Sequence, residues 1–424
     1  MAGVACFVLG GVACNNSNNN NQKPTDATLT ITTDGEGTTD PAPGPHGYLE
    51  GTSLTVTATA ADRNAFMGWS GDGTGTSNPM TIVLDVDKTV VAGFSSKTHG
   101  LPIPSGGGVP RPSGTPGNLA VIDWAGFKGA VTYTLDDSQP SQIEHYAELQ
   151  ATGVPMTFYL SSGWSNTSAA YDTTWAQAVR DGHEIGNHTV HHCRADITGC
   201  SLPPPPLATP ADEIELNRQY IMEHAGQSDV WTMASPFGDA NWDSIAKQRV
   251  FLHRDVFGGM VRPNDGTDPF HLPVYMAGTA DGGFGTGQSQ FDALIDTARA
   301  NDTWLIFLIH TILPTTNNWY NPIDIGVITG SITRAKALND VWIDTMVSVG
   351  AYWRAQKLLT ATAPSTTGNV MTWTWTLPDH FPPGKYVRVK VDGGTLAQGG
   401  APLVWDGRGY YEVSLDASSL TLSP

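Results

Sequence analysis

Three groups of reactive side chains are spaced along the middle of the chain. The aspartate pair Asp136-Asp137 comes first, the histidines His188 and His192 follow four positions apart, and His310 stands alone further on. Two neutral imidazoles and one carboxylate form the ligand set of a catalytic zinc ion, which leaves positions for water and a carbonyl oxygen. The second carboxylate of the pair is then available to accept a proton from water, and a histidine across the site to donate one. Such a set fits hydrolysis of an amide or an ester.

Each of these signals has an ordinary structural explanation when it is taken alone. An Asp-Asp pair after a strand commonly forms a turn or caps a helix. A His-x-x-x-His pair can place two imidazoles on one helical face, but many such pairs bind nothing. A lone histidine at the end of a strand is usually a hydrogen-bonded structural residue. It is the occurrence of all of them in this order that favours one shared site.

Short β-prone or apolar runs, alternating with helical stretches, must position these side chains. We expect strands at 131–135, 156–160, 230–234 and 304–309, and helices at 142–152, 174–180, 211–224, 291–300 and 335–349. Alternation of this kind predicts a mainly parallel sheet or an α/β barrel. Because the reactive residues directly follow several of the strands, their side chains should meet on one face, where α/β barrels carry their active sites.

The successive motifs resemble those of a known enzyme family. TLDD at 134–137, HTVHH at 188–192, SPFG at 235–238 and LIH at 308–310 are similar, in this order, to the motifs of the NodB-homology polysaccharide deacetylases, carbohydrate esterase family 4. The resemblance covers residues 118–357 and implies a distorted (β/α) barrel. It makes Asp136 the general base and His310 the general acid, and it makes Asp137, His188 and His192 the metal ligands. It also implies that the backbone N–H of Phe237, which follows Pro236, stabilises the oxyanion.

The sequence departs from the family pattern at two points. Family members often carry an arginine two residues before the motif proline, where it orients the base, and this chain has Ala234 there. Arg254 is a candidate to supply that charge, and an ordinary surface position is an equally good interpretation of it. The Asp-Trp motif that partners the acid histidine is also not evident, and Asp255 is a candidate to replace it. These departures bear on the tuning of the site and on the substrate subclass more than on metal binding.

Charge restricts the choice of partners. The chain has 22 Lys+Arg against 40 Asp+Glu, a net charge of −18, and nucleic acid binding requires clustered positive charge. The sequence therefore argues against nucleic acid as a partner. By the family resemblance, the partner is an acetylated polysaccharide or oligosaccharide.

The first residues indicate export. The apolar run at 3–13 is too short to span a bilayer, and it ends in Val-Ala-Cys14, which resembles the end of a bacterial lipobox. We expect a secreted or cell-envelope protein that is lipid-anchored on Cys14. The alternative is an unanchored secreted protein cut nearby. For Cys193 and Cys200, seven positions apart, a local disulfide is the favoured interpretation and a thiolate metal site is the rival.

The composition shifts predict a multidomain chain, with a central distorted barrel flanked by small all-β domains. We expect a leader and Asn-rich tether at 1–24 and a β module resembling a bacterial repeat at 25–97. A Pro/Gly linker at 98–117 then precedes the catalytic domain at 118–362, and a C-terminal β domain occupies 363–424. Trp69, in the first β module, is expected in its core rather than on a sugar-binding face.

The function that these observations favour is metal-dependent removal of acetyl groups from an extracellular or cell-envelope polysaccharide. An N-acetylated glycan such as chitin or peptidoglycan is favoured. The alternatives are an esterase that acts on O-acetyl xylan, and a glycan-binding surface protein whose barrel is catalytically silent. Ligand type and availability favour Zn²⁺, with Co²⁺ and Ni²⁺ as further options.

Overall fold

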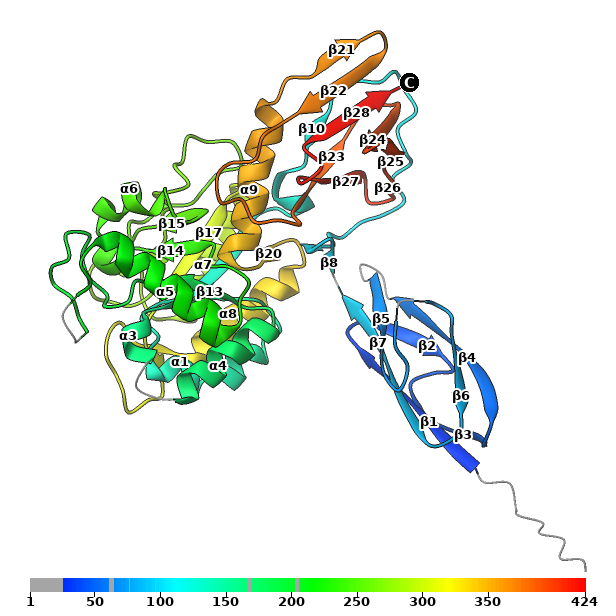
Figure 1. Cartoon of the computed structure of the whole chain (residues 1–424), viewed down its shortest axis with the longest axis horizontal. Helices are drawn as coiled ribbons and strands as arrows, with labels where there is room; N and C mark the ends of the chain where they lie inside the picture. The colour runs from blue at the N-terminus through cyan, green and yellow to red at the C-terminus, as the bar shows by residue number, and fades with distance from the viewer. Residues whose placement is uncertain (1–25, 61–64, 76, 96, 166–168, 203–205) are drawn as a thin grey trace, which may run out of the picture. The chain divides into compact units, whose positions relative to one another are not determined.

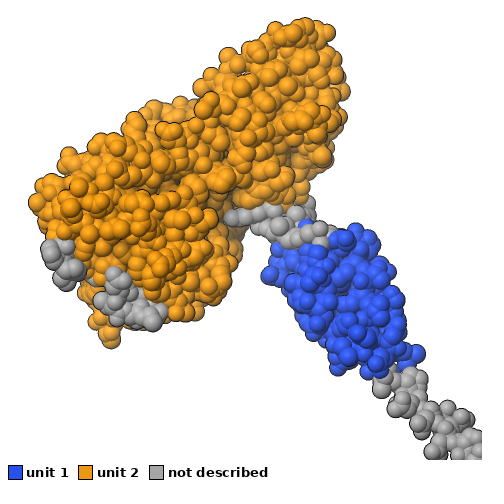
Figure 2. All heavy atoms as spheres, in the orientation of Figure 1, with its two compact units in different colours: residues 1–96 blue, residues 97–424 orange. Residues whose placement is uncertain are grey.

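The computed structural model describes residues 26–60, 65–75, 77–95, 97–165, 169–202 and 206–424. The chain divides into two compact units, Met1–Ser96 and Lys97–Pro424 (Figure 2). The expected leader and its Cys14 lie outside the described residues. Within the described ranges, none of the helices combines the length and the apolar composition that crossing a membrane requires.

The N-terminal unit contains two sheets that share one core. Their strand orders are β3-β1-β7-β5 and β2-β4-β6. The alternation along β4 turns Val56 and Ala58 inward, and Trp69 is only 5% exposed, which confirms its interpretation as a core residue. The strands are β1 (Asp26–Asp34), β2 (Gly37–Asp40), β3 (Gly44–Leu49), β4 (Thr52–Ala60), β5 (Ala65–Gly71), β6 (Met80–Leu84) and β7 (Lys88–Ser95).

The centre of the second unit is an eight-stranded parallel sheet, curved as a distorted (β/α) barrel (Figure 1). Its order is β15-β14-β13-β12-β11-β17-β16, and β20 also pairs with β11. Every residue of β11 and β17 is buried, as is typical of parallel strands that are covered on both faces. The strands are β11 (Ala130–Leu135), β12 (Thr157–Leu160), β13 (Glu184–Asn187), β14 (Thr232–Ala234), β15 (Leu252–Arg254), β16 (Tyr275–Met276), β17 (Trp304–Ile309) and β20 (Trp342–Ile343).

Helices alternate with these strands along the chain. The start of α5 follows from local chemistry, because Thr209 and Asp212 form a capping box around Pro210, and the helix ends at Gly226 in a left-handed conformation. The longer helices are α4 (Ala169–Arg180), α5 (Pro210–Ala225), α7 (Gln288–Ala300), α8 (Ile325–Leu338) and α9 (Met346–Ala361). The shorter ones are α1 (Pro140–Glu144), α2 (Tyr146–Gln150), α3 (Ser162–Ser165), α6 (Asp243–Ala246), and the 3₁₀ turns η1 (Asp123–Gly126), η2 (Pro236–Gly238) and η3 (Ala240–Trp242).

The helix expected at 335–349 is wrong. That segment contains the end of α8, strand β20 and the start of α9. Asn339 ends α8 in a left-handed conformation with φ 59°, and the side chain of Thr345 caps the start of α9. The apolar spacing that suggested one helix comes from two helices and a buried strand between them.

The C-terminal strands do not form a separate compact unit, contrary to the boundary expected at 363. Trp373, Val387 and Leu420 share one hydrophobic core with Trp353 of α9 and with Trp304 of the barrel. Two sheets have the orders β10-β23-β27-β26 and β21-β22-β28-β24-β25. Their strands are β10 (Ala120–Val121), β21 (Ser365–Thr367), β22 (Val370–Thr374), β23 (Tyr386–Lys390), β24 (Thr395–Gln398), β25 (Ala401–Pro402), β26 (Trp405–Asp406), β27 (Tyr410–Ser414) and β28 (Ser419–Ser423).

The segment expected as a Pro/Gly linker at 98–117 is hydrogen-bonded to this region. Val109 N–H donates to the Gly407 carbonyl at 2.7 Å, and Gly114 bridges to Gly393. The guanidinium of Arg111 donates to the carbonyl of Gly394 at 3.1 Å. Proline and glycine exclude regular structure here, but the backbone groups still find partners on the C-terminal strands. The remaining short pairs are β8 (Lys97–Thr98) with β9 (Leu101–Pro102), and β18 (Ile312–Leu313) with β19 (Ile323–Asp324).

Candidate metal centre and active site

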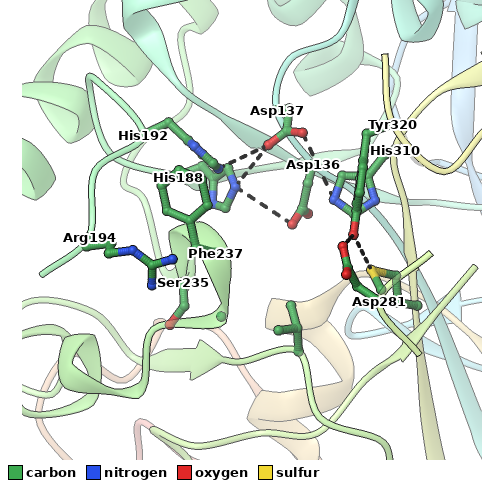
Figure 3. Close-up of a pocket in the computed structure, with 13 residues that line it drawn as sticks. Asp136, Asp137, His188, His192, Arg194, Ser235, Phe237, Asp281, His310 and Tyr320 are labelled. Carbon is green, nitrogen blue, oxygen red and sulfur yellow. Dashed lines mark hydrogen bonds and ion pairs between the residues drawn. The ribbon is translucent and has the colours of Figure 1, made fainter. Parts of the chain in front are cut away.

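The residues predicted to carry chemistry meet at the carboxyl ends of the parallel strands. Asp136 and Asp137 follow β11, His188 follows β13, and His310 follows β17 (Figure 3). Together with His192 they line a cavity of about 410 Å³. The other residues that line it are Arg194, Ser235, Phe237, Gly238, Val256, Met276, Asp281 and Tyr320.

Asp137, His188 and His192 turn their ligand atoms toward one point. The Oδ1 atom of Asp137 lies 3.2 Å from Nε2 of His188 and 3.3 Å from Nε2 of His192. All three side chains are at most 13% exposed. Ligand atoms that share a tetrahedral zinc ion at roughly 2.0–2.2 Å lie roughly 3.3–3.6 Å apart, so the observed spacing suits such an ion.

The outer contacts of the two histidines fit the same arrangement. Nδ1 of His188 is 2.9 Å from the Ala234 carbonyl, and Nδ1 of His192 is 3.1 Å from Oγ of Ser201. An Nδ1–H that donates to a carbonyl leaves the lone pair on Nε2, which faces the centre of the site. The donor set, two neutral imidazoles and a carboxylate, therefore fits a divalent transition metal.

The pKa values of Asp137 and His192 are shifted by burial and by the neighbouring charged side chains. Burial raises the pKa of Asp137, but the His188 hydrogen bond and the histidine charges outweigh it and hold that pKa well below its usual range. Burial, and then the charge of His188, lower the pKa of His192 to about 3. The carboxylate is therefore ionised and the His192 imidazole neutral at pH 7, as metal coordination requires.

The backbone around the site is unusual for residues other than glycine. Asp137 has φ 73°, Thr189 φ 64°, His192 φ 50° and Phe237 φ 58°. The left-handed conformation is uncommon for such residues and clusters at functional sites. The stretch 188–192 is an irregular, bent segment and not the helical face considered from the His-x-x-x-His spacing.

Asp136 lies beside these three ligands, and a buried arginine holds it. Its Oδ2 is 3.8 Å from Nε2 of His188, and its Oδ1 accepts a hydrogen bond from Nη2 of Arg254. Arg254 is 0% exposed, packs its guanidinium over the ring of Tyr159 at 4.7 Å, and pairs in register with Ala234 on β14. Position 234 carries an alanine, and the arginine that contacts Asp136 comes from the neighbouring strand β15.

His310 faces the ligands from the other side of the cavity. Its Nε2 is 4.0 Å from Oδ2 of Asp137, and Tyr320 lies edge-on to its ring at 4.8 Å. Burial lowers the pKa of His310, although Asp137 and Asp136 raise it. Its Nδ1 is buried and has no hydrogen-bond partner among the residues that the structure describes.

Asp255 does not take the place of the missing acid partner. It accepts a 2.6 Å hydrogen bond from Oγ of Ser235 and pairs with Nδ1 of His271 at 2.6 Å, and it makes no contact with His310 within the described ranges. Asp243, Asp255 and His271 form a second group of side chains of the types that bind metals. Nδ1 of His271 is hydrogen-bonded to Asp243 at 2.8 Å, and both of its carboxylate contacts are shorter than the 3.2 and 3.3 Å found at Asp137.

Pro236 and Phe237 form the 3₁₀ turn η2 at the rim of the cavity. The ring of Phe237 is 44% exposed and stands edge-on to His192, with 4.5 Å between centroids. Next to it, Cys193 and Cys200 are joined by a disulfide, so the thiolate alternative does not hold. The disulfide closes the loop that follows His192.

Residues 126–251 match the family model described as polysaccharide deacetylase. The chain contains a polysaccharide deacetylase domain. Residues 27–98 match the model described as divergent InlB B-repeat domain, so the N-terminal β unit is a module of that kind. No curated protein matches the chain.

Solved structures similar to the deacetylase domain share little sequence with it. A Mycobacterium smegmatis protein described as a polysaccharide deacetylase is 17% identical, covers 59% of this chain and 97% of its own, and has a TM-score of 0.41. A family 4 acetyl xylan esterase from Clostridium thermocellum, solved with a cobalt ion, is 17% identical over 52% of this chain and 89% of its own, with a TM-score of 0.33. The peptidoglycan deacetylase PdaC from Bacillus subtilis is 15% identical over 52% and 90%, with a TM-score of 0.34.

Sequence reasoning missed part of the cavity wall of the deacetylase domain. Arg194, Met276 and Asp281 line the site and were not singled out. Arg194 had a signal, because it stands two positions after His192 and directly after a cysteine. Asp281 lies on the loop after β16 and had none, since only the fold brings that loop to the cavity.

Proposed function

We propose that this chain removes acetyl groups from a polysaccharide by metal-dependent hydrolysis. The carrying observation is the convergence of Asp137, His188 and His192 in one cavity, with Asp136 alongside and His310 facing them. The match of residues 126–251 to the polysaccharide deacetylase family supports the reaction type.

Asp137, His188 and His192 would hold the metal, and their nitrogen and oxygen atoms favour Zn²⁺, with Co²⁺ and Ni²⁺ as alternatives. When bound, a divalent ion acts as a Lewis acid that polarises the acetyl carbonyl and lowers the pKa of water. The remaining chemistry is proton transfer and charge stabilisation, which the chain's own side chains and backbone supply.

Asp136 is the proposed general base. Its Oδ1 is held by Arg254 while its Oδ2 is directed toward the ligand group, so the carboxylate is oriented to take a proton from an attacking water. His310 is the proposed general acid, which gives a proton to the leaving nitrogen or oxygen of the sugar. The backbone N–H of Phe237, on the turn after Pro236, would stabilise the charge that develops on the acetyl oxygen.

The substrate class is an extracellular or cell-envelope glycan, with N-acetyl groups favoured over O-acetyl groups. The extracellular location of the glycan rests on the leader-like sequence that ends at Cys14, which also motivates a secreted or lipid-anchored location of the protein. Globomycin treatment of producing bacteria tests the anchor, since it should leave an unprocessed form, and Cys14→Ser should release the protein from the membrane fraction.

Acetate release tests the reaction. The purified chain, loaded with Zn²⁺, Co²⁺ or Ni²⁺, is assayed on N-acetylated chitin oligomers, peptidoglycan and acetylated xylan. We expect acetate from at least one glycan, loss of activity on chelation, and recovery when metal is returned. Asp136→Asn should keep the metal and lose about 10³-fold or more in kcat. A folded, metal-loaded protein that releases no acetate from any of these glycans would refute the proposal.

A further inference from the structure

Arg194 is an exposed cation in the wall of the active-site cavity, and it forms no salt bridge with a carboxylate among the described residues. It lines the same cavity as the metal ligands (Figure 3), and its guanidinium carbon lies 5.0 Å from the centre of the Phe237 ring. Among the described residues, none forms a hydrogen bond or an ion pair with that guanidinium. In a chain with 40 acidic and 22 basic residues, an arginine that remains unpaired at a catalytic cavity needs an explanation.

The nearest candidate for a partner is already engaged. Asp239 accepts hydrogen bonds from the backbone N–H of Ala195 at 2.9 Å and from Asn241 at 2.7 Å. Its carboxylate thus fastens the loop that carries Arg194 and makes no hydrogen bond to the guanidinium, although the two charges are close enough to attract each other. The guanidinium of Arg194 therefore remains able to hydrogen-bond a ligand, and it lines the cavity that substrate must enter.

The loop that carries this arginine is held in place. The disulfide between Cys193 and Cys200 closes it, and the Arg194 N–H donates to the Thr198 carbonyl at 3.0 Å. The Cys193 carbonyl accepts from Nε1 of Trp242 at 3.2 Å. A guanidinium on a fixed loop loses less entropy on binding than one on a free loop, so it is suited to recognition.

The cavity wall is electrically asymmetric. Arg194 and Phe237 lie on one side of the ligand group, and Tyr320 and Asp281 lie on the opposite side (Figure 3). The hydroxyl of Tyr320 donates to Oδ2 of Asp281 at 2.5 Å, so that side carries a negative charge. An anionic group on the substrate would be repelled by Asp281 and attracted by Arg194, which fixes the direction in which the sugar lies.

We propose that Arg194 forms a carboxylate-binding subsite, and that the preferred substrate is an acetylated glycan bearing a carboxylate close to the acetyl group. Guanidinium binds carboxylates through two parallel hydrogen bonds, and this pairing adds orientation as well as affinity. This inference rests on the deacetylase function proposed above. The carboxylate has two chemical sources, a lactyl ether on the acetylated sugar itself or a uronic acid as the neighbouring sugar.

Matched substrates test the subsite. Three oligosaccharides of N-acetylhexosamine are compared: one with a lactyl ether carboxylate on the acetylated sugar, one with a neighbouring uronate, and the lactyl compound converted to its methyl amide. We expect the wild-type, metal-loaded protein to favour one acid over the amide by about tenfold in kcat/KM, through KM. The preference should weaken at high salt, because the guanidinium is exposed.

Variants separate recognition from stability. Arg194→Gln should remove the preference for the acid, so that kcat/KM falls about tenfold more for the acid than for the amide, and Arg194→Lys should keep part of the preference. Arg180→Gln removes an exposed arginine of α4 outside the cavity and should change neither substrate. Equal losses on acid and amide in Arg194→Gln, or no preference in the wild type, would overturn the subsite.

A binding measurement distinguishes the two proposals. Calorimetry with the Asp136→Asn protein reports affinity for the same oligosaccharides without turnover. If the acid binds more tightly than the amide and Arg194→Gln abolishes the difference, the subsite stands even where no acetate is released, and only the proposed reaction fails. If acetate is released while acid and amide bind equally, the reaction stands and the subsite fails.

Discussion

The guanidinium of Arg254 donates a hydrogen bond to the carboxylate of Asp136, across two strands that are not neighbours in the sheet. Both side chains are buried, and the arginine also packs against Tyr159. One charge is therefore compensated by the other in a place where neither reaches bulk water. The relationship makes Arg254 a positioning residue for the proposed base.

Removing this positioning contact should impair catalysis more than metal binding. Arg254→Gln leaves Asp136 without its charge partner, so we expect kcat to fall about 10²-fold while the metal content stays at the wild-type level. Because position 234 is the register neighbour of position 254, the double variant Ala234→Arg, Arg254→Ala should recover about tenfold of the loss. Acetate-release kinetics and elemental analysis measure both effects; a double variant no better than the single one would contradict this geometry.

The two groups of ligand-type side chains should differ in metal binding. Their spacings differ, with 3.2 and 3.3 Å at Asp137 but 2.6 and 2.8 Å at His271. We expect the dialysed protein to retain one Zn²⁺ per chain, His192→Ala to lose it, and His271→Ala to keep it. Mass spectrometric metal analysis decides; two ions in the wild type, or a loss in His271→Ala, would show that the second group also binds metal.

The role of His310 as an acid is tested by the leaving group. We expect His310→Gln to lower kcat by about 10²–10⁴-fold on an N-acetylated glycan, whose leaving amine needs a proton. On 4-nitrophenyl acetate, whose leaving group needs none, the loss should be less than about tenfold. Similar losses on both substrates would instead point to a role for His310 in shaping the site.

Stability should fall on mild acidification because of His183. Burial lowers its pKa to about 4, although Asp181 raises it, while the unfolded chain keeps a value near 6.5. Between these two pKa values the unfolded state binds more protons than the folded state. The contribution of His183 to the free energy of unfolding is therefore complete above pH 6.5 and decreases as the pH falls toward 4. The contribution is about 3 kcal/mol.

Urea unfolding between pH 4.5 and 7.5 measures this contribution. His183→Gln should flatten the pH dependence, while His380→Gln, at an exposed histidine, should leave it as in the wild type. If the two variants show the same slope, the destabilisation has another origin.

The C-terminal strands should be needed for stability of the whole second unit. Arg388 on β23 is 0% exposed and donates to the carbonyls of Pro102 and Ala125 and to the carboxylate of Glu412. Because Arg388→Leu leaves these acceptors buried, we expect a loss of about 3–5 kcal/mol in the free energy of unfolding. Arg334→Gln, at an exposed pair with Asp296, should cost less than about 1 kcal/mol. Denaturant unfolding of both variants gives the comparison.

Local chemistry in the sequence determined much of this protein. The β-prone run that forms β11 and the wholly apolar run that forms β17 are typical of buried strands, so their own composition predicts these elements. The placement of Asp136, Asp137 and His310 directly after those strands then brought the residues to one face. The N-terminal β unit followed from strand alternation, and the core position of Trp69 from the size of that unit, in which a tryptophan between strands is usually buried.

Tertiary structure decided what depends on groups that are distant in sequence. No local sequence signal predicts that Arg254 contacts Asp136 or that Asp255 lies apart from His310. Nor does one predict that Arg194 and Asp281 line the same cavity. The packing of residues 98–117 and 363–424 is also decided by the tertiary structure. The proline-rich composition of the first segment predicts coil and the alternation in the second predicts strands, but neither pattern tells which surface the segment covers. The pattern of apolar and polar residues along a strand or helix determines which of its faces is buried. The partner of a buried charge comes from another strand, so it is determined only when the strands assemble into the sheet.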